Sequence, residues 1–100
     1  MLSDEFVKEI RESVSLSNII NRKVKLEKKG KNFLGLCPFH NEKTPSFNVN
    51  DEEGYYHCFG CGAHGDSISF VRNYENKSFM EAIQTISDIA GIKIPTNNFE

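Results

Sequence analysis

Residues 37–61 read CPFHNEKTPSFNVNDEEGYYHCFGC, and their pattern is the strongest indication of how the chain folds. It holds all three cysteines of the 100-residue chain, arranged as two pairs of potential metal ligands. Cys37 pairs with His40, Cys58 pairs with Cys61, and two residues separate the members of each pair. A two-residue gap lets one tight turn direct both side chains at a single point. The spacing therefore predicts two ligand-bearing turns that share one metal ion.

The predicted ligand set is three thiolates and one imidazole, from Cys37, His40, Cys58 and Cys61. This Cys3His set is typical of a closed structural zinc site, which leaves no position for an exchangeable water. An odd number of cysteines also argues against a secreted disulfide framework. In the turns, Pro38 adds stiffness and Gly60 permits unusual backbone angles.

Three alternatives to this ligand set stay open at the level of sequence. His57 or His64 could replace His40, although the spacing favours His40 because its turn mirrors the other one. An iron–sulfur cluster would more often use four cysteines. A redox dithiol at Cys58 and Cys61 is disfavoured because zinc would occupy both thiolates.

Around the two turns, the hydrophobic pattern predicts an α+β zinc ribbon: a small antiparallel sheet flanked by helices. Apolar residues recur at helical spacing over residues 4–13, and a second short helix is expected over 16–21. Alternating residues predict a basic hairpin with a turn at Gly30, followed by strands over 46–50 and 55–59. Further helices are expected from Asp66 to about residue 76, and from the capping box of Ser78 and Glu81 to Gly91. We therefore predict a single domain over residues 1–100, with helices at 4–21, the ribbon at 23–61 and helices at 66–91.

Composition narrows the class of protein further. The chain is 38% hydrophobic and 26% charged, which is ordinary for a folded soluble protein, and its acidic N-terminus is unlike a secretory signal. No apolar run approaches the length of a membrane span. We expect a cytoplasmic protein with no membrane partner.

Charge is strongly segregated along the chain. The formal net charge of −2 comprises +5 in residues 22–31 and −7 elsewhere. Lysines beside aromatic residues suit single-stranded nucleic acid, because cations neutralise phosphates while rings stack on unpaired bases. The predicted nucleic-acid contacts are Lys28, Lys29, Lys31, Phe33, Lys43, Phe47, Tyr55, His57 and Phe59. With a period of two, Tyr55, His57 and Phe59 should share the outer face, and Tyr56 and Cys58 the inner one.

Residues 30–47, 56–62 and 65–66 closely resemble the N-terminal zinc-binding domain of bacterial DnaG-type DNA primases, and the resemblance covers essentially the whole chain. It implies that the four residues above are the zinc ligands and that the sheet recognises the single-stranded DNA template where an RNA primer begins. The intact family members are DNA-directed RNA polymerases that make primers for replication. Their magnesium-dependent catalytic domain and helicase-binding domain would lie outside this chain. The implied partners are template DNA, the catalytic domain of the same or a neighbouring primase and, through regions absent here, the replicative helicase.

Two departures from the family pattern concern the predicted surface. His64 stands where the family commonly has Gly, and residues 51–54 are acidic where relatives often carry a lysine.

A competing interpretation is a protein-interaction ribbon whose exposed aromatics bind another protein. An autonomous enzyme finds little support, since the sequence has no nucleophile motif, no paired carboxylates in a motif context and no Gly-rich phosphate loop.

Overall fold

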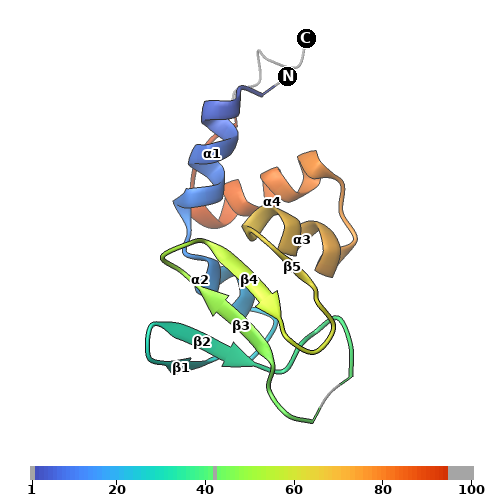
Figure 1. Cartoon of the computed structure of the whole chain (residues 1–100). Coiled ribbons are helices and arrows are strands. Elements are labelled where there is room, and N and C mark those ends of the chain that lie inside the picture. Colours follow the sequence, from blue (N-terminus) through green and yellow to red (C-terminus); the bar gives the residue numbers. More distant parts are fainter. Residues whose placement is uncertain (1, 42, 95–100) are drawn as a thin grey trace.

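The computed structural model describes residues 2–41 and 43–94. Its sheet has five antiparallel strands that follow one another in chain order (Figure 1). The strands are β1 (Glu27–Lys29), β2 (Asn32–Gly35), β3 (Phe47–Asn50), β4 (Tyr55–Cys58) and β5 (His64–Gly65). The predicted α+β class is confirmed, and β5 is an addition that was not predicted, because two residues are too few to show hydrophobic alternation.

Four helices accompany the sheet, and each begins where the sequence predicts, to within a residue. They are α1 (Asp4–Ser13), α2 (Leu16–Asn21), α3 (Ser67–Glu75) and α4 (Phe79–Ala90). Ser78 and Glu81 form the predicted capping box of α4, each side chain accepting a hydrogen bond from the other residue's backbone N–H. No helix in the described part of the chain is long and apolar enough to cross a membrane.

The helices cover one face of the sheet and one of its ends. Figure 1 shows α1, α3 and α4 gathered beyond the end of the strands, with α2 behind β3. Alternation along each strand sends one set of side chains toward these helices. The buried members of this inner set are Phe47, Val49, Tyr56 and Cys58. The predicted inward orientation of Tyr56 and Cys58 is confirmed.

The basic hairpin forms later in the chain than the alternation of Val24 and Leu26 predicts. The N–H of Val24 donates to the carbonyl of Ile20 at 2.8 Å, which ties this residue to the end of α2. The N–H of Leu26 donates to Asn21 Oδ1 at 3.1 Å. Because these donors bond to α2, strand pairing starts only at Glu27. The hairpin turn at Gly30 is confirmed, with a φ of 64°.

Candidate metal centre and nucleic-acid interface

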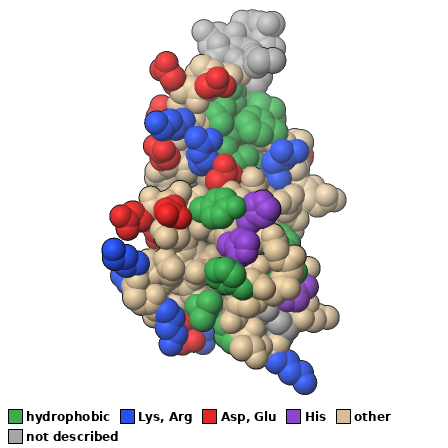
Figure 2. Space-filling model, in the orientation of Figure 1, with side chains coloured by type: hydrophobic (Ala, Val, Ile, Leu, Met, Phe, Trp, Pro, Cys, Tyr) green, Lys and Arg blue, Asp and Glu red, His purple; other side chains and the backbone are tan. Residues whose placement is uncertain are grey.

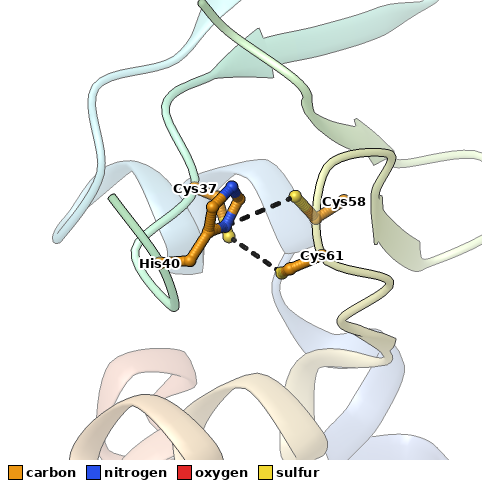
Figure 3. Close-up of side chains that lie close together, drawn as sticks. All are labelled: Cys37, His40, Cys58 and Cys61. Carbon is orange, nitrogen blue, oxygen red and sulfur yellow. Dashed lines mark hydrogen bonds between the residues drawn. The ribbon is translucent and has the colours of Figure 1, made fainter. Parts of the chain in front are cut away.

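The two predicted turns bring four potential ligand atoms together beside the sheet. One atom each from Cys37, His40, Cys58 and Cys61 lies within 4.8 Å of all the others. Figure 3 shows the four side chains pointing toward one another from two separate loops. The Sγ atoms of Cys37 and Cys61 are 3.8 Å apart, and Cys58 Sγ is 3.9 Å from His40 Nδ1. The candidate metal centre is defined by these four residues.

These separations fit the edges of a zinc tetrahedron. With Zn–S bonds of about 2.3 Å and Zn–N bonds of about 2.0–2.1 Å, an ideal tetrahedron places two sulfurs about 3.8 Å apart and a sulfur and a nitrogen about 3.6 Å apart. The observed Cys37–Cys61 distance of 3.8 Å matches the first value, and the Cys58–His40 distance of 3.9 Å exceeds the second slightly. The donor set and its spacing thus suit a four-coordinate structural zinc.

Backbone amides of both turns point at sulfur atoms. The N–H of Phe39 donates to Cys37 Sγ at 3.3 Å, and the N–H of Gly60 donates to Cys58 Sγ at 3.3 Å. Ser46 Oγ lies 3.5 Å from Cys58 Sγ. Donors of this kind stabilise negative charge on sulfur, as a thiolate ligand requires.

The two buried thiols differ in acidity. Burial is the largest influence on the Cys37 thiol, and its pKa is raised to about 12. The hydrogen bond from the Phe39 N–H lowers the pKa but offsets the effect of burial only in part. Burial also opposes ionisation of Cys58, but hydrogen bonds from Ser46 and from the backbone of Cys61 and Gly60 lower its pKa to about 7. Zinc binding removes thiol protons, so the Cys37 proton must leave when the metal binds.

Neither alternative histidine joins the cluster that the structure describes. His64 Nδ1 lies 2.9 Å from the carbonyl oxygen of Gly62, and its ring stacks on His57 with the centroids 6.1 Å apart. His57 also lies beside Phe59, with ring centroids 4.7 Å apart. Of the three histidines, the structure brings His40 to the sulfurs.

Both alternative histidines belong instead to a row of rings on the outer face of the sheet. This ring row consists of Tyr55, His57, Phe59 and His64. Pairing of His57 with His64 across β4 and β5 places them side by side, and Tyr55 is 6.0 Å from His64 between ring centroids. Phe59 is 71% exposed and Tyr55 is 41% exposed. Figure 2 shows two histidines adjoining hydrophobic side chains in the middle of this face.

His64 is the member of the ring row that sequence reasoning missed. The sequence places His64 near the second turn but does not by itself predict that His64 pairs with His57. The signal was available, since Gly60 and Gly62 stand between the two histidines and glycines favour tight turns. These two glycines could have indicated the β4–β5 hairpin.

Two predicted aromatic contacts do not share the outer face with the ring row. Phe47 is fully buried, since it pairs with Cys58 on the inner face and packs against Tyr56 and Phe70, so its prediction as a stacking residue is wrong. Phe33 is partly buried against the core, on the inner side with its partner Val49.

The predicted lysines are divided between the two faces. Lys28 pairs with Phe33, and its Nζ lies 5.9 Å from the centroid of that ring, so both sit on the inner side. Lys29 pairs with Asn32 on the outer side. Lys31 in the hairpin turn and Lys43 in the loop after His40 are exposed. Lys29, Lys31 and Lys43 therefore remain candidates for phosphate contacts.

Comparison with known proteins agrees with the geometry of the metal centre. A family model described as the CHC2 zinc finger matches residues 2–100. The chain belongs to this zinc-finger family.

Relatives of this CHC2 zinc finger carry the name DNA primase. The Lactococcus lactis DNA primase is 47% identical over 93 residues, which are 93% of this chain and 15% of the relative. The Escherichia coli K12 DNA primase is 46% identical over 90 residues, covering 90% of this chain and 16% of the relative. This chain therefore spans about one sixth of the length of these relatives.

A solved structure shares the fold. The crystal structure of the Aquifex aeolicus primase, comprising its zinc-binding and RNA polymerase domains, matches with a TM-score of 0.85 and 37% sequence identity. The match covers 100% of this chain and 24% of the other. The chain thus corresponds to the zinc-binding domain of a bacterial DNA primase, and the resemblance inferred from the sequence is confirmed.

Proposed function

We propose that this chain is the module with which a bacterial DNA primase recognises single-stranded template DNA at the start of a primer. The observation that carries the proposal is the ring row on the outer face of a sheet whose hairpin is rich in lysine. Tyr55, Phe59 and His64 are exposed, and His57 is half-buried between them. Each base stacked on an aromatic ring contributes about 1–3 kcal/mol. A short row of rings suits a few unpaired bases.

We propose that Cys37, His40, Cys58 and Cys61 bind one zinc ion, which crosslinks the two loops. With four protein ligands the ion has no open position, so it supplies structural stability and no Lewis-acid catalysis. The ligand Cys58 ends β4, which carries Tyr55 and His57 on its outer face. The metal centre therefore holds the strand on which the stacking surface is built.

The resemblance to bacterial DNA primases extends the proposal to the whole protein. The parent protein would synthesise short RNA primers for replication in the cytoplasm, using a magnesium-dependent catalytic domain outside this chain. Residues 4–21, 23–61 and 66–91 would act as one module beside that domain, and the replicative helicase would bind elsewhere. The last part of the predicted domain, residues 95–100, lies outside the described residues.

Titration of labelled single-stranded oligonucleotides at two salt concentrations tests DNA binding. Lys29→Ala should weaken binding. It should also reduce the salt slope, which is the slope of log affinity against log salt concentration, by about one, because one phosphate contact that releases a counterion is lost. His57→Ala should weaken binding by about 5–150-fold at either salt concentration, which is the loss of about one stacked base. Fluorescence anisotropy of the zinc-loaded chain measures both.

Lys8→Ala is the matched control for charge. Lys8 is exposed on α1, so its substitution changes net charge equally and should leave DNA affinity unchanged. Salt-insensitive binding, or no binding even at millimolar DNA, would exclude the proposal. Equal effects of Lys8→Ala and Lys29→Ala would exclude a phosphate contact at the hairpin.

A second candidate function is docking of a protein, in particular the parent's own catalytic domain. The observation that favours it is the partial exposure of Phe79 and Met80 on α4, each 38% accessible. Nuclear magnetic resonance shift mapping with single-stranded DNA, and then with the catalytic domain, would separate the two surfaces. Shifts confined to α4 with the catalytic domain and to the ring row with DNA would support both functions.

A further inference from the structure

A small groove crosses the outer face of the sheet beside the ring row. It has a volume of about 250 Å³ and runs over β2, β3 and β4. Its lining includes Asn32, Asn48, Asn50, Glu53, Tyr55 and His57, with Phe59 at its edge. We call this feature the asparagine groove. It is smaller than the sites of about 300–1,000 Å³ that hold drug-sized ligands, and its size suits a single small ring system.

Strand register explains why the three asparagines meet there. Asn48 pairs with Leu34 on one side and with His57 on the other. Asn50 pairs with Tyr55, and Asn32 lies two residues before Leu34, so all of these residues share the outer face. The amides therefore form the floor of the groove, and the rings stand along one side.

Two of the three amides have no hydrogen-bond partner for their oxygen within the described structure. The Oδ1 atoms of Asn32 and Asn48 are shielded from solvent and unpaired, whereas Asn50 Oδ1 accepts from the N–H of Glu53 at 3.0 Å. Unpaired buried acceptors are rare in folded proteins because they forgo hydrogen bonds to water. The terminal torsion of asparagine is broad, so rotation about it can turn the amide oxygen toward the groove without a change in the backbone. These two amides are uncommitted recognition groups.

The charge of the groove identifies the part of a nucleotide that it suits. None of the described residues lining it is Lys or Arg, and the acidic residue Glu53 is part of the lining. The carboxylate of Glu53 repels phosphate, and the unpaired oxygens of Asn32 and Asn48 favour a hydrogen-bond donor. Lys29 lies across from Asn32 on β1 and β2, where it can neutralise the adjacent phosphate.

We infer that the asparagine groove reads the edge of one template base, with Asn48 and Asn32 as the specificity-determining residues. The inference rests on the proposed function, because it assigns base selection within the same DNA-binding face. Asparagine amides pair with base edges that offer an amino donor, as with N6 of adenine, and carboxylates accept from N4 of cytosine. Thymine has no exocyclic amino group, and its single ring N–H lies between two carbonyl oxygens, which the unpaired amide oxygens and the Glu53 carboxylate would repel. The groove therefore selects an amino-bearing base over thymine.

The test compares oligothymidylate with the same oligomer carrying one central cytosine or adenine. In anisotropy titrations of the zinc-loaded chain, the amino-bearing base should tighten binding about tenfold, since a good amide–base pair discriminates by roughly that factor or more. Asn48→Thr should reduce this preference to about twofold or less while leaving affinity for oligothymidylate and its salt slope unchanged. Threonine is favoured in strands, so this variant retains β3.

Asn18→Thr is the matched control, since Asn18 is exposed on α2, behind the sheet, and should keep the full preference. Asn32→Thr provides a second variant, expected to act in the same direction. Binding of wild type to all three oligomers with equal affinity would overturn the inference and leave the proposed function standing. A preserved preference in Asn48→Thr, or uniform loss of binding by the folded variant, would also overturn it. If none of the oligomers shows salt-dependent binding, both the proposed function and the inference on base selection are wrong.

Discussion

Gly60 is the residue at which the metal centre is most tightly packed. A Cβ at this position would lie 2.9 Å from His40 Nε2 and 2.9 Å from Ser46 Oγ, closer than real Cβ contacts allow. The residue is thus required for close approach and not for a positive φ, which occurs at the neighbouring Gly62. The expectation that Gly60 supplies unusual backbone angles in this turn is wrong, because its φ is not positive.

Gly60→Ala should therefore weaken zinc binding by displacing the His40 ring or the Ser46 hydroxyl. We expect a loss of about tenfold or more in zinc affinity, comparable to losing a partner that orients a ligand. Chelator competition measures the affinity, and cobalt substitution reports the tetrahedral geometry. Gly30→Ala is the matched control, because nothing lies within 4 Å of its Cβ and only backbone strain at a φ of 64° results. Equal zinc affinities in the two variants would contradict the view that Gly60 is needed for close packing against His40 and Ser46.

At the level of single residues, the sequence predicted the metal centre better than the surface. Ligand spacing is a local property, so Cys37, His40, Cys58 and Cys61 could be recognised without the fold. Exposure of Phe47 depends on pairing with Cys58, a register between two strands that spacing alone does not reveal. Asn48 was likewise overlooked as a recognition group because its role depends on neighbours from β2 and β4.

Among the elements, the acidic turn between β3 and β4 has a structural role. Asp51 accepts hydrogen bonds from the N–H of Ser17 at 2.7 Å and from Ser17 Oγ at 2.6 Å. Ser15, the N-cap residue of α2, makes no side-chain hydrogen bond to the helix. Asp51 therefore caps α2 from a distant turn, which gives this acidic residue a function where a basic one would contact phosphate.

Asp51→Ala should destabilise the zinc-loaded chain by about 1–3 kcal/mol, because a hydrogen-bonded charge and the capping of α2 are both lost. Urea unfolding at constant zinc measures the change. Glu52→Ala is the control, since Glu52 is an exposed neighbour in the same turn and removes the same charge. Equal stability of the two variants would show that the contact with Ser17 contributes nothing.

Helices were better predicted than strands for a related physical reason. Capping boxes and apolar spacing act within a few residues, as at Ser78 and Glu81 of α4. The strands span four residues or fewer, and their limits depend on tertiary hydrogen bonds such as that from Leu26 to Asn21. The two-residue β5 has no periodic signal of its own.

The whole molecule is joined by an aromatic cluster built around Phe39, which belongs to the first ligand-bearing turn. Its ring centroid lies 6.1 Å from that of Tyr56 and 5.9 Å from that of Phe70, so it contacts both sheet and α3. The rings of Phe47 and Tyr74 complete its surroundings at 6.2 and 6.4 Å. Opening of this turn would therefore open the contact between sheet and helices.

Removal of zinc by a chelator should unfold the sheet and helices together. The apparent binding free energy of structural zinc, about 10–16 kcal/mol, matches or exceeds the total stability of about 5–15 kcal/mol typical of a small domain. Far-ultraviolet circular dichroism and tyrosine fluorescence should change together on chelation and recover with zinc but not with magnesium. Because Cys37 must lose a proton to bind the metal, the zinc affinity of the chain, corrected for protonation of the chelator, should fall as pH falls below 7. Persistence of the full helical signal after the metal has left would show that Phe39 does not couple the metal centre to the helices.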